Sequence, residues 1–132
     1  EREAAEQTRA AFAEVLRETV PGADAAFVAE LEAAHGKFKA AVEARDMRRI
    51  ATTNFEFVQL FTARSRNAVL RRSVRAVVHL VQLGSLHLPT AINFDQLADA
   101  QRLLIDAARS HDVSLGQSAL DRIRAIELTR LG

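Results

Sequence analysis

The sequence has no cysteine, tryptophan or tyrosine, and only two prolines and five glycines among its 132 residues. Without cysteine, the chain can form no disulfide framework, iron–sulfur cluster or thiol nucleophile. With 48% hydrophobic and 27% charged residues, the composition also excludes collagen-like repeats and a disordered chain. A chain of this size buries about 68% of the surface that its unfolded form exposes. We therefore expect one globular domain over residues 1–132, and the lack of cysteine fits a reducing, cytoplasmic location.

Long hydrophobic runs and an excess of charge of one sign are missing as well. The longest uncharged run, residues 76–94, is interrupted by histidines, amides, a glycine and a proline, so we expect no membrane span. Eighteen basic and 17 acidic residues give a net charge of +1, which is not the overall charge pattern of a nucleic-acid-binding domain. The sequence opens with Glu1 rather than Met, so we expect one domain of a longer polypeptide or a trimmed product.

What is present is a chain of helix-forming residues whose apolar positions recur at three- and four-residue spacing, which predicts an all-α fold. Pro21-Gly22 should end a first helix, and Asp24, Asp46 and Asn67 are placed to cap later ones. We predict a first helix over about residues 2–19 and a second that starts after Asp24 and ends near Asp46. A third carries Ile50, Phe57 and Phe61, a fourth runs from Asn67 to Gly84, a fifth starts near Asp95, and a last one follows residues 110–112, with a loop over residues 84–93.

Two amides interrupt apolar stripes on the predicted helices. Asn54 falls within the stripe of Ile50, Phe57 and Phe61, and Gln101 falls within the stripe of the helix that starts near residue 95. Both should point inward, where an unpaired polar group costs about 1–3 kcal/mol. Two interpretations stay open. The amides satisfy each other or backbone carbonyls, or they line a pocket and orient a small ligand.

Arg9 lies at the edge of the apolar stripe of the first helix. One interpretation is a surface cation whose stem packs on the helix, and the other is a guanidinium that pairs with the carboxylate or phosphate of a ligand.

Other chemistry-bearing residues give weaker patterns. The four histidines form no pair at helical ligand spacing, so we expect no metal site. No phosphate loop, nucleophile elbow or recognisable carboxylate dyad occurs, so we expect no enzymatic activity and no cofactor. A basic cluster near residue 66 could face DNA, an acidic partner or solvent, and we favour solvent. Its members are Arg64, Arg66, Arg71, Arg72 and Arg75.

Three stretches of the chain carry a family resemblance. Residues 44–61 open with Ala-Arg-Asp-Met and close with Asn-Phe-Glu-Phe-Val-Gln-Leu-Phe, and residues 66–70 read Arg-Asn-Ala-Val-Leu. Together with residues 100–112 they resemble the C-terminal FCD domain of GntR-type bacterial transcription regulators. In that family, a turn ending in Asp precedes a helix with an aromatic residue before a ligand position, and a Gly-Asn-like junction follows. Phe57 and Arg66-Asn67 occupy those places, and Arg9 falls roughly where the family has an arginine.

The resemblance implies an antiparallel bundle of six to seven helices that binds a small effector, often a carboxylate, and helps a homodimer form. In such regulators a separate N-terminal winged helix reads DNA, and we expect it upstream of this chain. Many members hold a metal with an Asp and a His four residues apart and a His on each of two later helices. Those positions align with Asn54, Val58, Gln101 and Ile123, of which none is a strong metal ligand.

The sequence therefore resembles a metal-free member of that family. The effector-binding residues that we predict are Arg9, Asn54, Val58, Gln101 and Ile123. Without a metal, an anionic effector would depend on an arginine such as Arg9, and a neutral effector is equally compatible. The alternative is a structural helical module for interaction or dimerisation, with no ligand, in which the two amides are satisfied internally.

Overall fold

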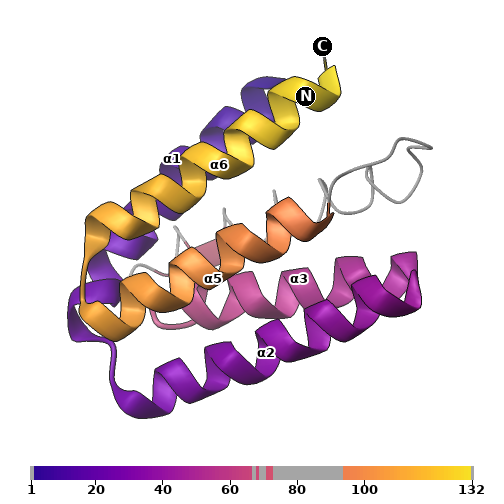
Figure 1. Cartoon of the computed structure of the whole chain (residues 1–132). Coiled ribbons are helices and arrows are strands. Elements are labelled where there is room, and N and C mark those ends of the chain that lie inside the picture. Colours follow the sequence, from indigo (N-terminus) through magenta and orange to yellow (C-terminus); the bar gives the residue numbers. More distant parts are fainter. Residues whose placement is uncertain (1, 67, 69–70, 73–93, 132) are drawn as a thin grey trace.

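The structure is a computed structural model that describes residues 2–66, 68, 71–72 and 94–131, with the side chains of residues 2–9 and 124–131 left aside. These residues form five α-helices and one 3-10 turn, with no strand among them (Figure 1). The predicted all-α fold is confirmed. The described part holds five helices with assigned bounds rather than the six to seven expected. Of the helix predicted after Asn67, only residues 68, 71 and 72 are described, and they are helical; its remaining residues and the loop over residues 84–93 lie outside the described residues.

The helix bounds follow the predicted ones closely. The elements are α1 (Arg2–Thr19), the 3-10 turn η1 (Val20–Gly22), α2 (Ala25–Ala44), α3 (Met47–Thr62), α5 (Phe94–Ser110) and α6 (Val113–Leu131). None of these helices is long and apolar enough to cross a membrane.

Two aspartates cap helices as predicted. Asp24 Oδ1 accepts a hydrogen bond from the Phe27 amide at 2.8 Å, and Asp46 Oδ1 accepts one from the Arg49 amide at 3.2 Å. Each of these carboxylates satisfies a backbone donor that has no partner inside its helix. Helix α2 ends at Ala44 because the next residue, Arg45, adopts a left-handed conformation with φ of 55°.

The turn between α5 and α6 is built like the turn between α2 and α3. His111 is left-handed with φ of 56°, and the Asp112 amide donates to the Ala107 carbonyl at 2.9 Å. The Asp112 carboxylate then accepts from the Ser114 hydroxyl and amide, and these hydrogen bonds lower the pKa of Asp112. Both tight turns therefore end one helix and cap the next within a few residues.

The helices form two groups that meet at one end (Figure 1). Helices α1 and α6 lie side by side and antiparallel, with the start of α1 beside the end of α6. Helix α5 packs on α6 and also on α2, which in turn packs on α3. At the α1–α6 contact, a Cβ on Gly116 would lie 3.1 Å from Leu16 Cδ1, so this glycine permits the close approach.

The buried apolar side chains form two clusters. The larger cluster draws on α1, η1, α2, α3, α5 and α6, and its larger members are Phe12, Val15, Leu16, Val20, Phe27, Leu31, Phe57, Phe61, Leu104, Ile105 and Leu120. The smaller cluster contains Phe38, Ala41 and Ile50, with Phe94 and Leu97 packed against it. In the larger cluster, the Phe61 ring makes edge-to-face contacts with Phe12 and Phe27, at centroid distances of 5.7 and 5.2 Å. Aromatic contacts of this geometry add to the stabilisation from area burial.

An ion-pair network joins α2 to α5 on the surface. The Arg102 guanidinium contacts both oxygens of Glu32, at 2.9 and 3.1 Å, and Arg109 Nη2 lies 2.7 Å from Glu32 Oε2. Hydrogen bonds from Arg102 and Arg109 lower the pKa of Glu32 from 4.5 to about 2. The Glu32 side chain is 35% exposed, so water screens part of this attraction.

We expect Glu32→Gln to lower the free energy of unfolding by about 1 kcal/mol near neutral pH, because a paired carboxylate is lost at a partly exposed site. The folded pKa of Glu32 is depressed, so its contribution is present above pH 4.5 and disappears as the pH falls towards 2. Urea unfolding of both proteins across this range measures the difference. Glu43→Gln, at an exposed position on the same helix, is the control. A difference in stability that does not change with pH would contradict a stabilising role for the ionised Glu32 carboxylate.

Candidate functional site

A hydrogen-bonded chain of three polar side chains crosses the interior between α2, α5 and α3. Gln101 Oε1 lies 3.0 Å from His35 Nδ1, and Gln101 Nε2 donates to Asn54 Oδ1 at 3.0 Å. Gln101 is 2% exposed and His35 is 5% exposed, whereas Asn54 is half-buried. We call these three residues the polar layer.

The polar layer lies between the two apolar clusters. On α2, His35 follows Leu31 of the larger cluster and precedes Phe38 of the smaller one. On α3, Asn54 stands between Ile50 of the smaller cluster and Phe57 of the larger one.

Helix α5 repeats the arrangement, because Gln101 stands between Leu97, packed on the smaller cluster, and Leu104 of the larger one. Three helices therefore place one polar residue each at the same level of the bundle.

The orientation of the Gln101 amide determines whether His35 Nδ1 carries a hydrogen. A carbonyl oxygen only accepts, so Gln101 Oε1 requires a hydrogen on His35 Nδ1. The chain therefore runs as donation from His35 to Gln101 and from Gln101 to Asn54. It uses the single acceptor atom of Asn54 and leaves the Asn54 NH2 group outside the chain.

The structure brings two of the five predicted effector residues into direct contact, namely Asn54 and Gln101. Val58 and Ile123 are half-buried and pack against the larger apolar cluster. Arg9 belongs to α1, but its side chain lies outside what the structure describes. The roles of these five residues in binding an effector remain predictions.

His35 is a member of the polar layer that the sequence analysis missed. Its position follows the α2 stripe of Leu31, Phe38 and Val42 at three- and four-residue spacing, so helical periodicity alone predicts that it points inward. The expectation that we drew for the histidines considered only metal-ligand spacing, which His35 does not satisfy.

The polar layer offers hydrogen-bonding groups but few strong metal ligands. Two amides and one imidazole offer a single strong ligand for a divalent transition metal. Among the described residues, no group of three His, Asp or Glu side chains could hold a metal ion. Every fully buried side-chain nitrogen or oxygen in that part of the chain has a hydrogen-bond partner.

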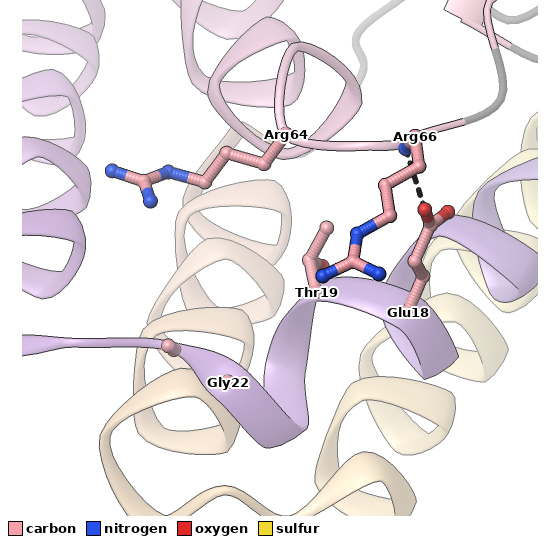
Figure 2. Close-up of a pocket in the computed structure, with 6 residues that line it drawn as sticks. Glu18, Thr19, Gly22, Arg64 and Arg66 are labelled. Atoms are coloured by element: carbon pink, nitrogen blue, oxygen red, sulfur yellow. Dashed lines mark hydrogen bonds between the residues drawn. The ribbon is translucent and has the colours of Figure 1, made fainter.

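A second feature lies beyond the C-terminal end of α3, away from the polar layer. A cavity of about 370 Å³ is lined by Glu18, Thr19, Gly22, Ala23, Arg64 and Arg66 (Figure 2). None of the five predicted effector residues lines this cavity, which we call the η1 cavity.

We expect Gln101→Leu to lower the free energy of unfolding by about 1–3 kcal/mol, because it leaves buried polar atoms of His35 and Asn54 without partners. Urea unfolding measures the change. Gln117→Leu, on the exposed face of α6, is the matched control and should stay within about 0.5 kcal/mol of the parent. A Gln101→Leu variant as stable as the parent would show that the polar layer contributes nothing to stability.

The comparisons with known proteins agree with the sequence resemblance. A family model described as FCD domain matches residues 4–125, which is most of the chain. No curated protein and no solved structure matches the chain. With an all-helical fold and a family match over almost its full length, the chain belongs to the FCD domain family, whose members are the C-terminal effector-binding domains of GntR-type regulators.

Proposed function

We propose that this chain is the effector-binding and dimerisation domain of a GntR-type transcription regulator, and that it binds a small organic effector without a metal. The observation that carries the proposal is the polar layer. The family resemblance aligns Asn54 and Gln101 with positions where many members hold metal ligands. Here these two amides are bonded to each other, and Gln101 is also bonded to His35. The FCD family is regulatory rather than enzymatic, so the proposal includes no catalytic step.

The proposed site recognises its effector by hydrogen bonds and shape. The Asn54 NH2 group lies outside the His35–Gln101–Asn54 chain and can donate to a ligand oxygen. Val58 and Ile123 supply apolar contact surface at the remaining two aligned positions. Sites of this kind are mostly apolar, with a few polar groups that fix the orientation of the ligand.

A carboxylate effector would need a cation in place of the missing metal. We propose Arg9 on α1 for this role, since its guanidinium could form two parallel hydrogen bonds to a carboxylate. A neutral effector would not need Arg9. Comparing Arg9→Ala with Gln101→Leu therefore separates the two classes of ligand.

Regulation would follow from a shift between two arrangements of the domain. A ligand that binds one arrangement of the helices more tightly increases the population of that arrangement. In a homodimer, the change would alter the spacing of the two DNA-reading winged helices that we place upstream of this chain. DNA contact is then a property of the longer regulator, in a cytoplasmic setting.

A second candidate function has an observation in its favour. The direct bond between Gln101 and Asn54 is also what a structural helical module without a ligand would contain, because its buried amides would satisfy each other. In that case the polar layer serves only the packing of the helices, and the domain acts through dimerisation.

A thermal-shift screen against organic acids, sugar acids, amino acids and acyl compounds, with and without added divalent metal, distinguishes these functions. A specific ligand at one hundred times its dissociation constant should add about 2.7 kcal/mol of stability. We expect a shift that does not depend on metal and that Gln101→Leu abolishes, while Gln117→Leu keeps it.

Loss of the shift in Arg9→Ala would identify a carboxylate effector, and retention would identify a neutral one. A shift that required metal would contradict the metal-free site. No shift with any compound would favour the structural module.

A further inference from the structure

We propose that the η1 cavity is a second binding site, for a small anion that carries a phosphate or carboxylate group. The cavity lies where the end of α3 meets η1, and its two cationic lining residues are Arg64 and Arg66. This site is separate from the polar layer and does not rest on the proposed effector function. Its volume of about 370 Å³ falls within the range of small-molecule pockets.

The Arg66 side chain provides the main argument for an anion. Figure 2 shows it extending from the segment after α3 across the cavity towards Thr19. Arg66 is exposed, and its backbone amide donates to Glu18. Its guanidinium makes no hydrogen bond or ion pair with the described residues, and its charge contributes to the lowered pKa of Glu18. A guanidinium presents five donors in a planar fork that matches the oxygens of a carboxylate or phosphate.

Arg64 supplies a second positive charge on another side of the cavity. Its guanidinium carbon lies 4.2 Å from the centroid of the Phe27 ring, and its Nη2 lies 3.5 Å from Glu30 Oε1. The contact with Glu30 is long and exposed, so most donors of the Arg64 guanidinium stay available to an anion.

Glu18 is the one acidic residue that lines the cavity, and its carboxylate is already engaged. Glu18 Oε2 accepts from the Ser65 hydroxyl at 2.7 Å, and Oε1 accepts from the Arg66 amide. These hydrogen bonds lower the pKa of Glu18, so the carboxylate is charged at neutral pH and holds the Ser65–Arg66 backbone in place. Arg71 donates to the Ser65 carbonyl and fixes the same segment from the other side.

The cavity floor is built from small groups. Thr19 is buried and its hydroxyl donates to the Val15 carbonyl at 2.9 Å, so it is committed to α1. Gly22 has nothing within 4 Å of the place where a Cβ would stand, which leaves room for a ligand beside the η1 backbone. The result is a hollow lined by two arginines and one glutamate.

Titration of the chain with inorganic phosphate and with citrate, at constant ionic strength, tests the proposal. We expect saturable changes in the backbone amide NMR signals of Gly22 and Ala23, and none at Gln101. Arg66→Gln should weaken binding by about tenfold or more, since it removes a charge-assisted contact. Arg17→Gln, an exposed arginine of α1 outside the cavity, is the control and should bind as the parent does.

Binding of phosphate alone, citrate alone or both would support the site and identify the group it prefers. Signal changes that grow linearly with concentration, or that Arg66→Gln leaves unchanged, would overturn the proposal. Gln101→Leu should leave anion binding unaffected, so failure here is distinct from failure of the effector site.

Discussion

A buried glutamine that must keep both of its hydrogen bonds determines how three helices of this domain meet. Gln101 is almost fully enclosed, and its two polar atoms reach His35 on α2 and Asn54 on α3. Sliding α5 by one residue along its neighbours would break both bonds and leave polar groups unpaired in the interior. The apolar clusters above and below the polar layer supply most of the burial, whereas the layer specifies the register.

Much of the fold could be predicted from the sequence, because local rules govern it. Asp24 and Asp46 cap helices where expected, and the apolar stripes place the helix faces correctly. Periodicity also predicted that Gln101 points into the bundle. Its bond to Asn54 was one of the two interpretations that the sequence left open. His35 was missed because the histidines were weighed only as metal ligands, although the stripe on its helix predicts that it points inward. Its partner, 66 residues away, could not be found from spacing along one helix. The η1 cavity likewise depends on how the end of α3 meets η1.

The two polar features of the domain have different physical character. The polar layer is largely buried and its side chains are bonded to one another, so a ligand there must offer a better set of hydrogen bonds than the layer already has. The η1 cavity is charged and open to solvent, and its Arg66 guanidinium makes no hydrogen bond or ion pair with the described residues. A regulator with both features would sense two classes of compound through separate parts of one bundle.

The most direct test of the polar layer is the protonation of the His35 ring, measured by nitrogen NMR of the imidazole in the unliganded protein. The account predicts a hydrogen on Nδ1 that exchanges slowly with water, because this hydrogen is donated to Gln101 Oε1 inside the bundle. A neutral ring with its hydrogen on Nε2 alone would contradict it. In that case Gln101 would have to donate to His35, and the hydrogen-bonded chain would run in the opposite direction.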